Sequence, residues 1–344
     1  MGAIGRFVDR IAAPRIGDNA PRWPGSGGHV ESWFVRANDP NGRRALWCKL
    51  TILSPLQGDP VAEAWAIAFD GDRTLGLRST VPLRDADVRD PVAGLRVADC
   101  RMDLGAPAAA SGSIAMGSDC LRWDLTWAAD AGNAGAPLSL LPSRLLLRTG
   151  FPRSKLLTPC PAATFSGTFW WDDHCIRVDG WRGMQGHNWG REHAAEYAWG
   201  QCLFDDAPDG PVMAEAVTAR LRVAGRLTPP ISGLVVRQGG RQWRFDALVD
   251  LWRQEAQVGE RDWTLRMRGP DGAAELRLDG GDAPFACLGY GNPDGTTRYC
   301  WNTKLARAEL RVEPRNGRPF SCASAHGGAL ELLRPRPIAG ALVV

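Results

Sequence analysis

A chain of 344 residues is longer than one hydrophobic core usually supports, so its length predicts about two domains. A net charge of +3 without a long basic face argues against nucleic acid as a partner, and no apolar run reaches the roughly 18 residues that a membrane span needs. Nine scattered cysteines without a C-x-x-C pair favour free thiols, so we expect a cytoplasmic protein.

The first half of the chain reads as a series of strands. Residues 31–35 alternate between apolar and polar side chains, residues 46–53 form a longer apolar run, and in residues 61–69 alanines alternate with larger side chains. Clusters of Gly, Pro and Asp separate these segments, and helical periodicity is scarce. The pattern predicts an all-β fold of sandwich or barrel type.

Residues 138–161 interrupt this pattern, because leucines and other large apolar groups are interspersed there with four basic side chains. Three interpretations stay open. The segment is a long connection whose leucines cover the core between the domains, which we favour. Alternatively it is a lid over a lipophilic cavity, or a surface that makes peripheral contact with a membrane.

The densest stretch of the chain is Gly-His-Asn-Trp-Gly at residues 186–190. Two glycines around polar and aromatic groups predict a turn, and the alternation in residues 197–203 predicts a strand after it. We expect His187, Asn188 and Trp189 to be buried and hydrogen-bonded at the junction of two domains.

The second half contains clearer hairpins. Residues 234–236 and 243–245 flank a Gly-Gly turn, and residues 263–278 read as two strands around a Pro-Asp-Gly turn. A last long strand over residues 298–312 changes phase near residues 302–305, which predicts a β-bulge.

The two halves also resemble each other. Trp47 and Glu63 are sixteen residues apart, as are Trp199 and Glu215, so one offset of 152 residues relates both pairs. We interpret this match as a duplicated β-domain.

Several stretches, read together, resemble a known family: residues 29–34, 45–69, 151–166, 186–190 and 289–310. The chain is similar there to the two-domain lipocalin-like proteins that include AttH and hydroxyneurosporene synthase, the carotenoid hydratase. More distant members are tocopherol cyclase and fungal Diels–Alderase-type cyclases. The resemblance implies two tandem lipocalin-like antiparallel β-barrel domains with a lipophilic pocket and neither a metal nor an organic cofactor.

The duplication places the boundary between an N-terminal domain over residues 1–180 and a C-terminal domain over residues 181–344.

One departure from the family pattern bears on function. In the hydratases an acidic residue precedes the His-Asn-Trp-Gly sequence, whereas this chain has Gly186. A hydratase must protonate an alkene, so the obvious proton donor is missing at this position.

Other chemistries lack their residues. His187 and His193 are six residues apart with Glu192 between them, which is not the H-E-x-x-H pattern of a zinc site, so we expect no metal. Neither a G-x-S-x-G sequence nor a glycine-rich phosphate loop occurs.

The two related glutamates are candidate acids. Strand alternation places Glu63 on one face with Trp65, and Glu215 on one face with Met213, so one carboxylate is expected to point inward in each domain. Such a carboxylate is either a strut paired with Arg or Lys, or it stays protonated because burial raises its pKa, and then it can act as the acid.

We therefore predict that the protein binds a lipophilic small molecule of terpenoid, polyene or polyketide type in an aromatic pocket near the domain junction. Indole faces stabilise carbocations, which suits cofactor-free hydratase, isomerase or cyclase chemistry. A non-catalytic carrier and a structural module that binds a protein are the alternatives, and the oligomeric state stays open. The candidate catalytic residues are Glu63, Glu215 and His187. The candidate ligand-binding residues are Trp65, Trp171, Asn188, Trp189, Tyr197, Trp199, Gln201, Tyr299 and Trp301.

Overall fold

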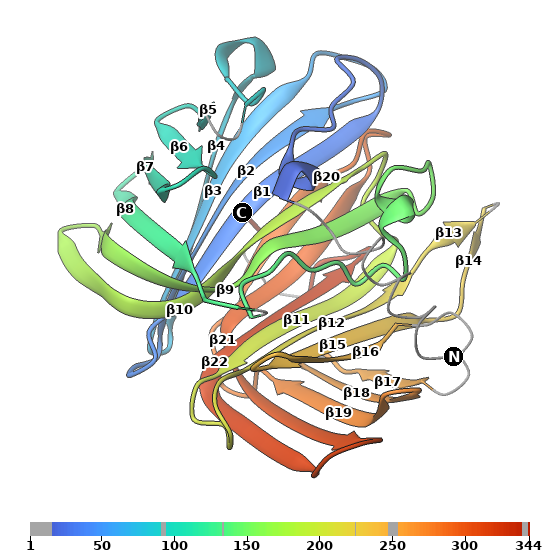
Figure 1. The fold of residues 1–344 in the computed structure, drawn as a ribbon. Helices are drawn as coiled ribbons and strands as arrows, with labels where there is room; N and C mark the ends of the chain where they lie inside the picture. The colour runs from blue at the N-terminus through green and yellow to red at the C-terminus, as the bar shows by residue number, and fades with distance from the viewer. Residues whose placement is uncertain (1–15, 91–93, 133, 224, 247–253, 339–342) are drawn as a thin grey trace.

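The computed structural model describes residues 16–90, 94–132, 134–223, 225–246, 254–338 and 343–344. Two ten-stranded antiparallel sheets follow one another along the chain, and each is strongly curled (Figure 1). The all-β class with two tandem lipocalin-like domains is confirmed. The second sheet lies below the first in Figure 1, and β20 and β21 rise from it to contact strands of the first sheet.

In the first sheet, the strands that come first and last along the chain pair with each other at the centre. Its strands are β1 (His29–Asn38), β2 (Arg44–Ser54), β3 (Val61–Asp70), β4 (Arg73–Pro82), β5 (Leu95–Val97), β6 (Cys100–Asp103), β7 (Ala108–Met116), β8 (Asp119–Ala129), β9 (Ser154–Trp171) and β10 (His174–Gly190). They are ordered β4-β3-β2-β1-β10-β9-β8-β7-β6-β5. Short 3-10 helices lie in the connections: η1 (Ile16–Asn19), η2 (Leu83–Asp85) and η3 (Arg144–Leu147).

The second sheet repeats this arrangement. Its strands are β11 (Glu196–Phe204), β12 (Val212–Arg220), β15 (Ile231–Gln238), β16 (Arg241–Phe245), β17 (Gln254–Val258), β18 (Asp262–Gly269), β19 (Gly272–Asp279), β20 (Ala286–Gly291), β21 (Thr297–Pro314) and β22 (Phe320–Arg334). Their order is β16-β15-β12-β11-β22-β21-β19-β18-β17, and β20 pairs with β21. A separate small hairpin consists of β13 (Arg222–Val223) and β14 (Arg226–Leu227).

The order of the strands also shows a duplication, but it relates the strands of the two halves differently from the sequence match. Because β1 lies beside β10 and β11 beside β22, strand order equates β1 with β11 and β2 with β12. The 152-residue offset instead equates β2, which holds Trp47, with β11, which holds Trp199. The sequence match is therefore displaced by one strand from the structural repeat.

Both predicted hairpins and the bulge are confirmed. β15 and β16 flank Gly239 and Gly240, and β18 pairs with β19 across the Pro-Asp-Gly turn. The register of β21 against β22 shifts between Thr303 and Ala308, which includes part of the expected stretch. However, β21 is not the last long strand, because β22 follows it.

The turn predicted at residues 186–190 is wrong. These residues end β10, which pairs with β1 on one side and β9 on the other. The glycines allow close packing rather than a turn: a Cβ on Gly186 would lie 2.2 Å from Cζ of Phe34, and one on Gly190 would lie 1.9 Å from a backbone oxygen. The first sheet consequently continues past residue 180 to Gly190, so the boundary predicted at 180/181 falls inside β10.

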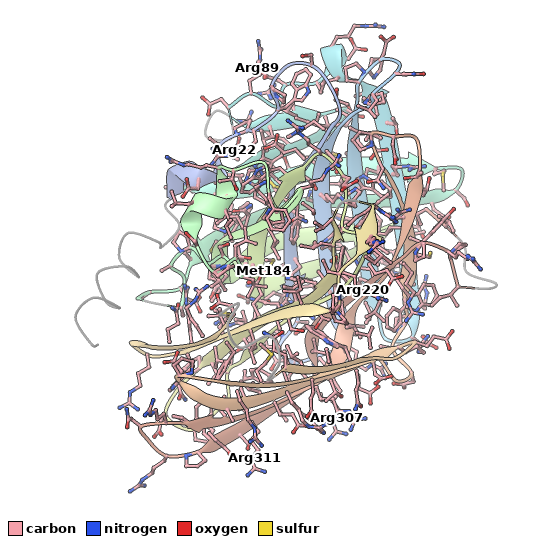
Figure 2. All side chains as sticks on the ribbon, turned by 90° about the vertical axis from the view of Figure 1, so that its right-hand side faces the viewer. Arg22, Arg89, Met184, Arg220, Arg307 and Arg311 are labelled. Atoms are coloured by element: carbon pink, nitrogen blue, oxygen red, sulfur yellow. The ribbon has the colours of Figure 1, made fainter. Side chains whose placement is uncertain are left out.

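Strand alternation gives the central strands two buried faces. On β3 the alanines face the interior of the first sheet, whereas Trp65, Ile67 and Phe69 join a core between the two sheets. Met213 of β12 and Met184 of β10 belong to the same interdomain core. In Figure 2 Met184 lies inside the molecule, between the two layers.

Hydrogen bonds accompany this core across the junction. The buried guanidinium of Arg36 donates to the side-chain oxygen of Gln201, and Nδ2 of Asn38 donates to the carbonyl oxygen of Lys304 at 2.5 Å. Within the described ranges, no helix has the length and apolar character that crossing a membrane requires.

Candidate functional site

A cavity of about 400 Å³ lies between the two sheets. Both sheets and the segment that joins β8 to β9 contribute to its wall. The lining includes Phe34, Trp47, Lys49 and Asn188 of the first sheet, Tyr197, Trp199, Tyr290 and Glu331 of the second sheet, and Leu140, Leu146 and Phe151 of the joining segment. Pockets of this size with mostly apolar walls and a few polar groups are typical of small-molecule sites.

Strand alternation explains which residues reach this cavity. On β2, Leu46, Cys48 and Leu50 pack inside the first sheet, so Trp47 and Lys49 face the second sheet. The same rule sends Asn188 of β10 toward the cavity and its neighbours toward the interior of the first sheet.

Aromatic rings form much of the wall. Phe34 lies 6.4 Å from Trp47 and meets Trp199 edge-on at 6.2 Å between ring centres. Tyr290 meets Trp65 edge-on at 5.9 Å and stacks on His193 at 5.2 Å. Such rings supply apolar contact area and negative faces that attract a cation.

Lys49 is the cation at these rings. Its Nζ lies 3.6 Å from the ring centre of Tyr290, 5.5 Å from that of Trp65 and 5.7 Å from that of Trp47. Burial lowers the pKa of Lys49 to about 8, although Glu63 and Glu331 act in the opposite direction. Near neutral pH the side chain is therefore a mixture of ammonium ion and amine.

Glu331 is one of two carboxylates in the cavity wall, with Asp246, and it is held by several donors. Nζ of Lys304 donates to Oε1 at 2.6 Å and Nδ2 of Asn302 donates to the same oxygen at 3.2 Å, while the hydroxyl of Tyr197 donates to Oε2 at 3.2 Å. The neighbouring His193 is neutral, because burial, Lys49 and a nearby arginine lower its pKa to about 3.

Glu215 lies behind the wall rather than in it. Its Oε1 accepts hydrogen bonds from Oγ1 of Thr158 at 2.6 Å and from Nε1 of Trp199 at 3.2 Å. Oε2 is buried without a hydrogen-bond partner among the described residues. Burial raises the pKa of Glu215 to about 7. The carboxyl group thus positions Trp199, whose ring lines the cavity.

Glu63, in contrast, is paired with a basic side chain. Its Oε1 lies 3.8 Å from Nη1 of Arg78, and its Oε2 accepts a hydrogen bond from Nε1 of Trp65 at 3.3 Å. Burial raises its pKa, while Arg78 and Lys49 lower it. Both glutamates are buried, as expected, but they point toward the interdomain core and not into the barrel of their own domain.

His187 does not reach the cavity. It stacks on Trp33 at 4.7 Å inside the first sheet, and its Nε2 lies 2.8 Å from Oε1 of Glu31. Glu31 also hydrogen-bonds His29 at 3.0 Å. Burial alone would raise the pKa of Glu31, but the two histidines outweigh it and lower that pKa. The prediction of His187 at the domain junction is wrong because a strand sends His187 and Asn188 to opposite faces.

Of the residues predicted as ligand-binding, Asn188, Tyr197 and Trp199 line the cavity. Asn188 is half-buried, and its Oδ1 lacks a hydrogen-bond partner within the described residues. We expected all three motif residues to be buried at the junction. Asn188 lies at the junction but is only half-buried, whereas His187 and Trp189 are buried away from it.

The remaining predicted residues lie outside the cavity lining. Trp65 packs behind Tyr290, and Gln201 bridges the sheets by donating to the carbonyl oxygen of Pro161 at 2.5 Å. The others pack elsewhere: Trp171 in the first core, Trp189 against His187, Trp301 against Phe285 beside the second core, and Tyr299 half-buried on β21.

Sequence reasoning missed Lys49, Tyr290 and Glu331. A signal was present for two of them: Lys49 is a single charge in the apolar run 46–53, and Glu331 is a single charge among leucines in β22. A charge on a strand that is buried on both faces needs a partner or a function.

The joining segment covers the core between the domains, as we favoured for residues 138–161, and it also lines the cavity. Leu138 and Leu140 belong to the interdomain core, while Leu140, Leu146 and Phe151 also line the cavity. Leu145 is 73% exposed and Phe151 is 53% exposed, so apolar groups also face outward here.

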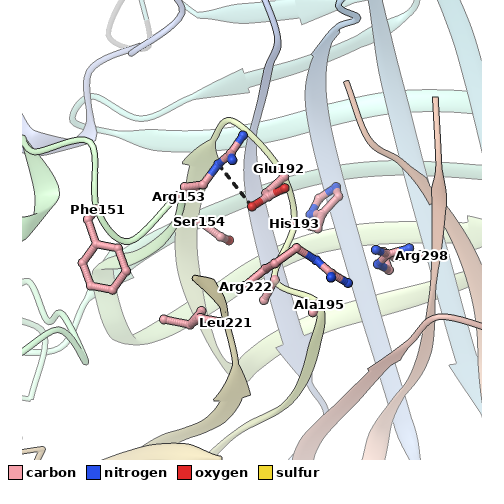
Figure 3. Close-up of a pocket in the computed structure, with 10 residues that line it drawn as sticks. Phe151, Arg153, Ser154, Glu192, His193, Ala195, Leu221, Arg222 and Arg298 are labelled. Atoms are coloured by element: carbon pink, nitrogen blue, oxygen red, sulfur yellow. Dashed lines mark ion pairs between the residues drawn. The ribbon is translucent and has the colours of Figure 1, made fainter. Parts of the chain in front are cut away.

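A small polar hollow adjoins the cavity, because Phe151, Ser154 and His193 line both. Arg153, Arg222 and Arg298 line this hollow, and Arg153 forms an ion pair with Glu192 at 3.2 Å (Figure 3). Across the described part of the chain, no three His, Cys, Asp or Glu side chains are grouped to hold a metal ion.

No family model matches the sequence. Two curated relatives from Mycobacterium tuberculosis, "Uncharacterized protein MT0513" of strain CDC 1551 and "Uncharacterized protein Rv0493c" of strain H37Rv, are each 31% identical over 297 residues, which is 86% of this chain and 85% of theirs. The chain belongs to the family of these mycobacterial proteins.

Solved structures share its fold. A putative AttH (NE1406) from Nitrosomonas europaea has a TM-score of 0.53 at 13% identity, covering 91% of this chain and 96% of its own. CghA has a TM-score of 0.53 at 11% identity, covering 95% and 96%, and its complex with Sch210972 has a TM-score of 0.52 at 13% identity. The fold that the sequence resemblance implied is thereby confirmed.

Proposed function

We propose that this protein binds a lipophilic small molecule in the cavity between the two sheets and carries out cofactor-independent acid–base chemistry on it. The observation that carries this proposal is the cavity itself: about 400 Å³, walled by Phe34, Trp47, Trp199 and leucines, with Lys49 and Glu331 in the wall. A fold neighbour, CghA, has been crystallised with Sch210972, which supports ligand binding by this fold.

The acid that the family places before the His-Asn-Trp-Gly sequence has no room in this chain, since the ring of Phe34 fills the space beside Gly186. Lys49 supplies a replacement. With its pKa at about 8, its ammonium form can donate a proton to a polyene and its amine form can remove one near neutral pH. The indole faces of Trp47 and Trp199 would stabilise the resulting cation by about 0.5 to 2 kcal/mol each. Hydratase, isomerase and cyclase reactions share this step.

The nine cysteines are free thiols, six of them buried, which supports a reducing compartment such as the cytoplasm as the place of action.

Binding is tested with retinol, a polyene alcohol, by following quenching of tryptophan emission. Val217 lines the cavity, so Val217→Trp should fill part of it and weaken binding at least about tenfold. Val258→Trp introduces the same side chain at an exposed position on β17 and should leave binding unchanged. Equal binding by both variants would place the ligand elsewhere.

Chemistry is tested with the lipid that co-purifies with the protein, identified by mass spectrometry and returned to the protein in deuterated water. Acid–base turnover incorporates deuterium at carbon, and Lys49→Met should abolish it. Binding without any deuterium uptake would show a carrier instead of an enzyme.

A further inference from the structure

Lysine is confined to the neighbourhood of the cavity. Only three of the 41 basic residues are lysines, and all three are buried: Lys49, Lys155 and Lys304. Lys49 and Lys155 line the cavity, and Lys304 donates to Glu331, which lines it too. Lysine is ordinarily among the least buried residue types, so this distribution points to a role for amines at this site.

The three amines differ in what they contact. Nζ of Lys155 donates to the carbonyl oxygen of Pro152 at 2.7 Å, and Nζ of Lys304 lies 2.6 Å from Glu331. Nζ of Lys49 has neither a hydrogen-bond acceptor nor an ion-pair partner among the residues that the structure describes, and it lies near the rings of Tyr290, Trp65 and Trp47. Its lone pair, when the amine is neutral, is therefore not engaged.

The amine of Lys49 is also a competent nucleophile near neutral pH. Because burial lowers its pKa to about 8, roughly a fifth of the side chain is neutral at pH 7.4, against well under 1% for an ordinary lysine. Desolvated lysines of this kind form Schiff bases with carbonyl compounds.

The surroundings suit the product as well as the reactant. A protonated imine is a cation, and the face of Tyr290 lies 3.6 Å from Nζ to receive it, with Trp47 and Trp65 next to it. Burial raises the pKa of the Tyr290 phenol, so the ring stays neutral and its face stays available to the cation.

We propose that Lys49 forms an imine with a lipophilic aldehyde bound in the cavity. The nitrogen bonds to the carbonyl carbon, its two protons pass to the oxygen, and the C–O bond breaks to release water. The imine nitrogen then takes up one proton from water to give the protonated imine. The inference rests on the proposed function, because the aldehyde must enter the same cavity.

The test uses all-trans-retinal as the aldehyde and retinol as its unreactive counterpart. The full-length protein is incubated with retinal and sodium cyanoborohydride, which reduces an imine to a stable secondary amine, and the adduct is located by peptide mass spectrometry. We expect one adduct at Lys49. Lys155, an amine on the same cavity with its donor engaged, should stay unmodified and serves as the internal control.

Lys49→Arg keeps the positive charge but cannot form an imine, so it should lose the adduct. Retinol binding by the wild type without an adduct at Lys49, or with equal labelling of Lys155, overturns the inference and leaves the binding function standing. Failure of the wild type to bind retinol refutes the binding function instead. Since the peptide map of the wild type decides the point, the result does not depend on whether the variant folds.

Discussion

Replacing Glu215 with Gln should make the protein relatively more stable as the pH rises. Glu215 is fully buried, Thr158 and Trp199 share its Oε1, and Oε2 has no partner among the described residues. Burial raises the pKa of this carboxyl group from 4.5 to about 7. The folded protein therefore resists ionisation of the group, and the unfolded chain does not.

The sign and size of the effect follow from proton linkage. Below pH 4.5 the carboxyl group is neutral in both the folded and the unfolded state, so its raised pKa does not affect the free energy of unfolding. Between pH 4.5 and 7 the unfolded chain loses the proton first, and the free energy of unfolding falls by about 3 kcal/mol in total. Above pH 7 both states are ionised and the loss stays constant. Gln is neutral throughout, so Glu215→Gln escapes this loss.

Urea unfolding between pH 4.5 and pH 8, followed by tryptophan fluorescence, measures the difference. The free energy of unfolding of Glu215→Gln minus that of the wild type should rise by about 3 kcal/mol across this range. Glu255→Gln is the matched control, because that side chain is 73% exposed, and its difference should stay flat. A flat difference for Glu215→Gln as well would mean that the carboxylate is ionised in the folded protein and that the reasoning is wrong.

Two further predictions concern β1 and β10. Gly186→Ala should lower the free energy of unfolding by about 1–3 kcal/mol, since its Cβ would meet an aromatic ring at 2.2 Å, whereas Gly150→Ala, with no atom within 4 Å, should change it by less than about 0.5 kcal/mol in urea titrations. Glu31→Gln should destabilise the fold by about 1–3 kcal/mol in the same titrations, because an amide nitrogen replaces one of the two buried oxygens that pair with His187 and His29, yet the protein that remains folded should bind retinol normally. Loss of retinol binding in folded Glu31→Gln would contradict the placement of this cluster away from the cavity.

The sequence predicted those parts of the fold that depend on local pattern. The β15–β16 and β18–β19 hairpins were found from alternation and turn residues, because both partners lie close together in the chain. The long strands β9, β10 and β22 were missed. Their glycines and small residues make sense only against distant partners, as at Gly186, where the space is filled by a side chain of β1.

The candidate site was predicted in part, for the same reason. Alternation in β11 correctly placed Tyr197 and Trp199 on one face, and that face lines the cavity. Alternation also showed that Glu63 and Glu215 are buried, but it cannot tell whether a face points into a barrel or toward a second domain. Only the packing of the two sheets distinguishes these cases, and it assigns both glutamates to the interdomain core.

The position of the cavity follows from how each sheet uses its two faces. On the inner faces, apolar side chains such as those of Leu50 in the first domain and Leu234 in the second complete the core of each domain. On the facing outer surfaces, polar groups find partners across the junction: Arg36 with Gln201, and Thr158 with Glu215.

Lys49 departs from this rule, because it lies on the same face, beside the cavity, with aromatic rings but no acceptor within the described part of the chain. Burying an amine without an acceptor is costly, and the cost is removed if a ligand supplies the missing atom. The ligand should therefore be apolar along most of its length and carry an oxygen where it meets Lys49. Because Lys49 comes from the first sheet, while Tyr290 and Glu331 come from the second, neither domain alone should bind it.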